Sequence, residues 1–129
     1  MPENNILTHE IKESVIEMMV LVKGQVEHTL EAIVNFDKDI CQEVIIQEKR
    51  VNALDLKIDK DSERIMALYS PVAIDLRCII SSLTINTFLE RIGDNAQAIC
   101  NYILEMENPF ITDVVEKTAV INQIKIILE

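Results

Sequence analysis

The chain has 129 residues, which is enough for one compact domain with a sizeable buried core. It contains only 2 glycines, 3 prolines and 4 % aromatic residues, so turns are few and long helices are favoured. Its formal net charge of −10 disfavours binding to a nucleic-acid backbone, which depends on patches of lysine and arginine. Such an acidic chain is better suited to cations or to basic partner surfaces.

Three further features concern the compartment in which the protein works. The cysteines Cys41, Cys78 and Cys100 show no CxxC spacing, and the N-terminus lacks a basic segment followed by an apolar stretch. No run approaches the roughly 18 to 20 consecutive apolar residues that a membrane-spanning helix requires. We therefore expect a soluble protein of the reducing cytoplasm that does not insert into a membrane.

Apolar residues at steps of three and four predict a first helix from about Ile6 to Val34. Gly24 interrupts this helix at a cost of about 1 kcal/mol, which the packing of so long an apolar face can offset. Asp37 is the expected N-cap of a second helix that ends near Tyr69. The expected core stripe of the first helix is Ile11, Val15, Met18, Val22, Val26, Leu30 and Ile33. The expected core stripe of the second is Ile40, Val44, Val51, Leu54, Ile58 and Ile65.

The pair Ser70–Pro71 predicts the start of a third helix, which continues to about Met106. Asn108–Pro109 then marks a boundary before a short amphipathic helix from about Thr112 to Leu128. Because the connections are short, consecutive helices should pack antiparallel. The sequence thus predicts an all-α fold: an up-down three-helix bundle of long antiparallel helices with a short fourth C-terminal helix.

The expected third helix carries two different apolar faces. One stripe turns acidic along its length, and a second apolar face appears in the later half of the helix. A kink or twist of the helix would explain this, and so would contact with a second subunit. The first stripe is Val72, Leu76, Ile79 and Leu83, continued by Asn86, Glu90 and Asp94. The second face is Ile85, Leu89, Ile92, Ala96, Ile99 and Ile103.

Asp55 and Asp59 are four residues apart and therefore lie on one face of the second helix, with Glu48 about two turns earlier. Like charges at this spacing repel by a few tenths of a kcal/mol in an isolated helix. Flanking Lys57 and Lys60, solvent, or a bound cation could offset this repulsion. Spacing alone leaves the three explanations open.

The third helix repeats the pattern with Glu90 and Asp94. From Asn86 to Glu116 there are six acidic residues and one basic residue, Arg91, which makes neutralisation by lysine or arginine weak and favours a cation. Gly93 either permits tight helix packing or clears space around a metal. Carboxylate ligands alone suit Mg²⁺, Ca²⁺ or Mn²⁺, whereas iron usually recruits imidazole as well.

Three stretches resemble the PhoU family in the right order: Arg50–Asp59, Pro71–Arg77 and Leu89–Asp94. The resemblance implies that Asp55 and Asp59 form one metal-binding motif and Glu90 and Asp94 a second, with Glu48 as a secondary ligand. It implies transition-metal ions, commonly in an iron cluster; the choice among Fe, Mn, Zn and Mg stays open. Asp55 is a shorter variant of the usual Glu.

The resemblance also implies a negative regulator of the phosphate-starvation response, which contacts the ATPase of a phosphate ABC transporter and a sensor histidine kinase. Family members usually carry two tandem three-helix repeats. Residues 1–109 correspond to one such repeat, and residues 110–129 to the start of a second repeat or a short C-terminal helix. We therefore expect a homodimer in which a second copy replaces the missing repeat.

Other functions find less support in the sequence. A di-iron oxidase would need Glu-x-x-His motifs, and neither His9 nor His28 is preceded by Glu at that spacing. No nucleophile motif and no glycine-rich phosphate loop is present, so we do not expect an enzyme. The competing hypothesis is a structural interaction or dimerisation module that binds no metal.

Overall fold

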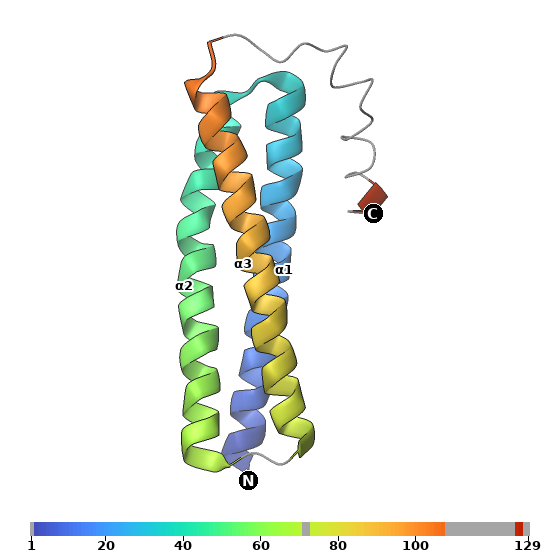
Figure 1. Ribbon diagram of the computed structural model, residues 1–129, viewed down its shortest axis with the longest axis vertical. Coiled ribbons are helices and arrows are strands. Elements are labelled where there is room, and N and C mark those ends of the chain that lie inside the picture. Colours follow the sequence, from blue (N-terminus) through green and yellow to red (C-terminus); the bar gives the residue numbers. More distant parts are fainter. Residues whose placement is uncertain (1, 71–72, 108–125, 128–129) are drawn as a thin grey trace.

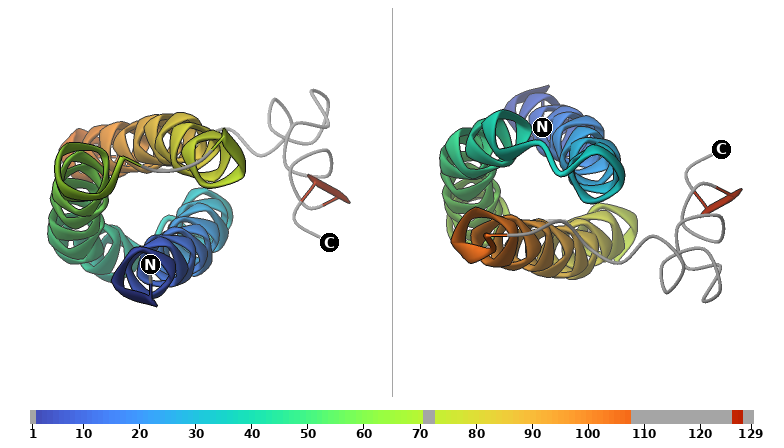
Figure 2. Two further views of the ribbon diagram at one scale, coloured as in Figure 1. Left: turned by 90° about the horizontal axis from the view of Figure 1, so that it is seen from below. Right: turned by 90° about the horizontal axis from the view of Figure 1, so that it is seen from above.

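The computed structural model describes residues 2–70, 73–107 and 126–127. Three long helices follow one another: α1 (Pro2–Asn35), α2 (Lys38–Tyr69) and α3 (Ala73–Glu105). They run up, down and up, and seen from either end they stand at the corners of a triangle (Figures 1 and 2). The predicted all-α, up-down three-helix bundle is confirmed for the described residues. No described helix has both the length and the hydrophobicity that a membrane span demands.

The turn between α1 and α2 has the local chemistry that the sequence predicts. Asp37 caps α2, and its Oδ1 accepts hydrogen bonds from the backbone N–H groups of Asp39 (3.0 Å) and Ile40 (3.3 Å). Phe36 before it adopts a positive φ of 51°, which reverses the chain in two residues. At the other end of α2, Ser70 lies in the left-handed region with φ 42°. The predicted Pro71 start of the next helix lies outside the described residues.

Buried positions recur along the helices in alternating steps of three and four, an average of 3.5 residues. This period is typical of helices that supercoil around one another with a left-handed twist. The buried seam positions of α1 are Ile11, Val15, Met18, Val22, Gln25, Thr29 and Ala32; Thr8, Ser14 and Leu30 are also buried. On α3 they are Ile79, Ser82, Asn86, Gly93, Ala96, Cys100 and Ile103, with half-buried Leu89 in register.

Three apolar clusters fill the core. The cluster nearest the start of α1 includes Ile11, Ile58 and Ile79. The next contains Met18, Val22, Val51 and Leu54, and the cluster nearest the α1–α2 turn contains Ala32, Cys41, Val44, Ala96, Cys100 and Ile103. Between the last two clusters the seam positions are occupied by Gln25, Glu48 and Gly93. At this level the core is therefore interrupted by a polar layer.

The structure corrects the expected core stripes. Val26 and Ile33 are only half-buried, because the 3.5-residue seam drifts away from them and buries Gln25 and Ala32 instead. Leu76 is exposed.

The second apolar face of α3 is buried only in part. Ala96 and Ile103 are buried, whereas Ile85, Ile92 and Ile99 are exposed. The helix itself is continuous from Ala73 to Glu105, so the gradual drift of the seam accounts for the apparent change of face. The predicted fourth helix lies outside the described residues apart from the helical pair Ile126–Ile127.

Candidate metal centre

The polar layer of the core brings one residue from each helix together. Gln25 of α1 is fully buried and Glu48 of α2 is 2 % exposed. The Gln25 Nε2 donates a hydrogen bond to Glu48 Oε2 at 2.7 Å and another to the Val44 carbonyl oxygen at 3.3 Å. A Cβ at Gly93 of α3 would lie 3.0 Å from Gln25 Oε1 and 3.1 Å from Glu48 Oε2. Gly93 thus provides the room in which this hydrogen-bonded pair sits.

This layer contains acceptor atoms without a hydrogen-bond partner among the described residues. They are Gln25 Oε1 and Glu48 Oε1; Asn86 Oδ1, two turns away along α3 at the level of Asp55, is also buried without a partner. Buried acceptors are nearly always paired, and leaving one unpaired costs about 1–3 kcal/mol. A proton or a cation close to Glu48 would satisfy such atoms.

The charge state of Glu48 responds to its surroundings. Burial raises the pKa of Glu48 to about 7; the hydrogen bond from Gln25 lowers it, and the neighbouring Asp94 and Glu90 raise it. The carboxyl group of Glu48 therefore binds a proton more readily than an exposed glutamate does. The effect of Asp94 also shows that the second predicted pair reaches the edge of the polar layer.

The antiparallel packing of α2 and α3 sets the two predicted acidic pairs against each other. The Asn86 Nδ2 donates a hydrogen bond to Asp55 Oδ1 at 2.5 Å. Loss of hydration raises the pKa of Glu90, and Asp55, Asp94 and Asp59 raise it further. Loss of hydration also raises the pKa of Asp59, with Asp55 and Glu63 adding to the effect. All five residues predicted as ligands therefore influence one another electrostatically. We use the name acidic groove for this set of side chains, without implying a cavity: Glu48, Asp55, Asp59, Glu90 and Asp94.

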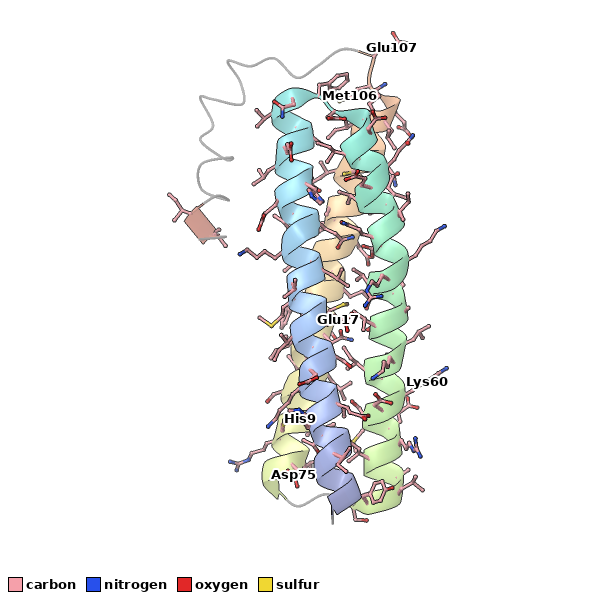
Figure 3. The ribbon with its side chains drawn as sticks, turned by 180° about the vertical axis from the view of Figure 1, so that it is seen from behind. His9, Glu17, Lys60, Asp75, Met106 and Glu107 are labelled. Carbon is pink, nitrogen blue, oxygen red and sulfur yellow. The ribbon has the colours of Figure 1, made fainter. Side chains whose placement is uncertain are left out.

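Basic side chains do not neutralise this groove. The salt bridges among the described residues join His9 to Glu13, Lys23 to Glu27, Arg50 to Glu17, and Lys57 to Asp61. Lys57 Nζ also donates a hydrogen bond to Ser14 Oγ of α1 at 3.2 Å. Lys60 extends outward from the bundle, as Figure 3 shows. Among the described residues, neither Lys57 nor Lys60 forms a salt bridge with Asp55 or Asp59.

The chemistry of the groove fits a hard or borderline cation, because carboxylate oxygens are the ligands such ions take. In the part of the chain that the structure describes, no three His, Cys, Asp or Glu side chains already converge on a point where they could hold a metal ion. Asp59 and Asp94 are exposed, and their carboxylates are not held by a salt bridge. Ion binding would therefore require these side chains to turn towards one another.

Sequence reasoning missed the amide members of the site. It followed Val26 as the core residue of α1 and passed over Gln25, the residue that holds Glu48. It placed Asn86 on the stripe but gave it no role, and Asn86 bonds Asp55. A usable signal existed: Gln25, Glu48, Asn86 and Gly93 all fall on the 3.5-residue seams, where apolar residues are the rule.

Comparison with known proteins covers the whole of this groove. A family model described as "PhoU domain" matches residues 15–103. The chain is 36 % identical over 101 residues to the phosphate-specific transport system accessory protein PhoU of Escherichia coli (strain K12), covering 78 % of this chain and 42 % of that protein. It is 35 % identical over 101 residues to the protein of the same name from Serratia marcescens, with the same coverage.

A third relative is the PhoU homolog of Aquifex aeolicus (strain VF5), which is 37 % identical over 101 residues, or 78 % of this chain and 46 % of that protein. The chain thus spans less than half the length of these relatives. No solved structure matches it. The resemblance seen in the three sequence motifs is confirmed.

Proposed function

We propose that this chain, which belongs to the PhoU family, regulates phosphate transport through contacts with other proteins and binds metal ions in its acidic groove. The observation that carries the proposal is the family match over residues 15–103, which contains every residue of the groove and of the polar layer. Its relatives bear the name of accessory proteins of the phosphate-specific transport system. A regulatory protein without catalytic activity is the function in keeping with that name.

The partners that we propose are the ATPase of a phosphate ABC transporter, a sensor histidine kinase and a second copy of the chain, all meeting in the cytoplasm. The net charge of −10 supports contacts with basic surfaces of such partners. Deletion of the gene should change phosphate-responsive expression, and capture experiments with the purified ATPase and kinase should retain this chain. Unchanged expression together with failure to bind either partner would refute the regulatory role.

The metal ligands that we propose are Asp55, Asp59, Glu90 and Asp94, with Glu48 as a secondary ligand. A bound ion, whether Fe, Mn, Zn or Mg, supplies positive charge where these carboxylates repel one another. Two amide side chains position the proposed ligands. Asn86 holds Asp55 at the α2–α3 boundary, and Gln25 fixes the buried Glu48 from α1. Because the ligands come from two helices, binding should stabilise the packing of α2 against α3.

Thermal unfolding of chelator-treated protein tests the metal proposal. An ion at 100 times its dissociation constant adds about 2.7 kcal/mol of stability, which should raise the unfolding temperature. The double variant Asp59→Asn with Asp94→Asn should lose this gain. A control with the same change of charge, Glu31→Gln with Glu43→Gln, alters exposed residues outside the groove and should keep it. If none of the four metals raises the unfolding temperature, the metal proposal fails.

A structural interaction module that binds no metal is the second candidate. It is favoured by one observation: no preformed set of three ligands exists among the described residues. On this hypothesis the groove carboxylates are solvated, and both double variants should be more stable than the parent, because each removes two negative charges from an acidic chain. Equal responses of the two double variants to added metal would support it.

A further inference from the structure

The side of the bundle between α1 and α3 exposes a set of large apolar side chains. Six of them, each 39–59 % exposed, define what we call the α1/α3 face: Ile16, Met19, Ile85, Phe88, Ile92 and Ile99. A groove of about 150 Å³ lies on the same side, between Val26–Ile33 of α1 and Ile92–Ile99 of α3, and its walls are almost entirely apolar. Contiguous apolar surface of this kind marks a site where another protein surface packs.

The α1/α3 face has the apolar area that a symmetric protein interface needs. The exposed fractions of its six side chains add up to about three whole side chains, or roughly 500 Å² at about 170 Å² each. A standard interface buries about 800 Å² of each partner, and between identical subunits about 65 % of that area is apolar. The requirement is therefore also roughly 500 Å² for each copy.

The α1/α3 face is separate from the carboxylates of the acidic groove, which lie where α2 meets α3. Two basic side chains, Lys23 and Arg91, lie beside the face. Glu27, also beside it, forms a salt bridge of 3.8 Å with Lys23, and Arg91 lies over the Phe88 ring, 5.8 Å from its centroid. Charges beyond a Debye length, about 8 Å at physiological salt, are largely screened. Two copies can therefore meet on this face without opposing their acidic surfaces.

The face carries both a ridge and a groove, as the self-complementary patch of a two-fold dimer must. We call Met19 and Phe88, which are 49 % and 57 % exposed, the ridge. They lie at one level of the bundle, because their sequence neighbours Met18 and Leu89 pack in the same core cluster. The groove is centred on α3 near Ala96, a small residue. Ala96 is about 12 Å along α3 from Phe88, at 1.5 Å per residue.

A two-fold axis perpendicular to the helices at Ile92 would bring the ridge of each copy onto the groove of the other. Positions equally far from Ile92 then meet: Phe88 faces the partner's Ala96, and Ile85 faces the partner's Ile99. We infer that the chain pairs with a second copy of itself through the α1/α3 face, with the two α3 helices antiparallel and Ile92 at the axis. The inference rests on the second copy proposed above as a partner, and on neither metal binding nor phosphate regulation.

Opposite charges introduced at Ile92 test the inference. Sedimentation of the full chain in chelator should give twice the mass of 14.7 kDa. Ile92→Lys and Ile92→Glu each place two like charges at the axis and should weaken association by about 100-fold or more. An equimolar mixture of the two variants should restore the dimer, because lysine then faces glutamate. Leu56→Lys and Leu56→Glu, at an exposed leucine of α2, are the matched controls and should leave the native dimer unchanged.

A second pair of variants leaves the axis itself unaltered. Ile85→Lys combined with Ile99→Glu should still dimerise, because opposite charges face each other twice. Ile85→Lys combined with Ile99→Lys should dissociate. Both positions are exposed in the described structure, and circular dichroism checks that the helices persist in every variant.

The inference is overturned if the Ile92 variants dimerise as the native chain does, or if they dissociate and their mixture stays monomeric. A dimer that ignores both sets of variants refutes this face and leaves the second copy as a partner. A native chain that stays monomeric at every accessible concentration refutes the second copy as well. The metal and phosphate proposals are tested separately and are unaffected by either result.

Discussion

Replacing Gly93 by alanine tests how closely α3 approaches the buried pair of Gln25 and Glu48. In an exposed helix interior this change would stabilise the protein by about 1 kcal/mol through helix propensity alone. At Gly93 the added Cβ meets Gln25 Oε1 at 3.0 Å and Glu48 Oε2 at 3.1 Å. Both side chains are at most 2 % exposed, so neither can swing into solvent to make room.

Two costs oppose the gain in propensity. Overpacking a filled core costs about 1–3 kcal/mol. Displacing the oxygens also weakens the 2.7 Å hydrogen bond from Gln25 to Glu48, and a bond to a charged group contributes about 1.5–3 kcal/mol. The oxygens are the ends of flexible side chains, so part of the strain should relax. We therefore expect Gly93→Ala to lower the free energy of unfolding by about 1–2 kcal/mol, net of the propensity gain.

The chain supplies its own control in Gly24, the other glycine. A Cβ at Gly24 meets nothing within 4 Å, so Gly24→Ala should stabilise α1 by about 1 kcal/mol. Urea unfolding followed by circular dichroism at constant pH measures both variants. A third measurement combines Gly93→Ala with Gln25→Ala, which removes one of the two obstructing oxygens and should reduce the cost of the first change. If Gly93→Ala stabilises the protein as much as Gly24→Ala does, the proposed close packing is wrong.

Other predictions follow from single contacts. The pKa of Glu48 rises on folding from 4.5 to about 7, so the folded state binds the proton of this carboxyl more tightly than the unfolded state does. Protonation of Glu48 therefore stabilises the fold fully below about pH 4.5, and this stabilisation is lost as the pH rises through 7. Unfolding measured in chelator should show a loss of about 3 kcal/mol over this range, and Glu48→Gln should flatten the profile. Burial, then Cys100 and Asp37, raise the pKa of the Cys41 thiol to about 12, so a maleimide should label half-buried Cys78 well before Cys41; equal rates would contradict the buried setting. Asp37→Ala should cost about 1 kcal/mol by removing the cap of α2, and an unchanged urea midpoint would count against that cap.

The sequence predicts the helices well because their signals are local. The Asp37 cap, the end of α2 at Tyr69 and the long uninterrupted helices each depend on a few neighbouring residues. The choice of buried residue within a turn is different. Both Val26 and Gln25 could continue the buried stripe of α1 at helical spacing. Gln25 is the buried residue because the three helices supercoil around one another. Hydrophobicity favoured the wrong residue of the two.

The acidic pairs were also visible in the sequence, since spacing four residues apart fixes a shared helix face. Their assembly into one groove was not. That assembly requires the register of α2 against α3, which the structure shows through the bond from Asn86 to Asp55 and through the effect of Asp55 on Glu90. Whether the groove binds metal stays a prediction.

Several departures from ordinary core chemistry lie close together between α1, α2 and α3. Glu48 and Gln25 occupy seam positions that would be more stable with apolar residues, and Gly93 gives up about 1 kcal/mol of helix propensity to admit them. Asp55, Asp59, Glu90 and Asp94 add mutual repulsion on the surface directly outside. Gln25, Glu48 and Asn86, which each leave a buried oxygen without a partner, are therefore linked to this set of carboxylates, and together these residues come from all three helices. Such local conflicts are expected at functional sites rather than scattered through a fold, because only function compensates for the stability they remove.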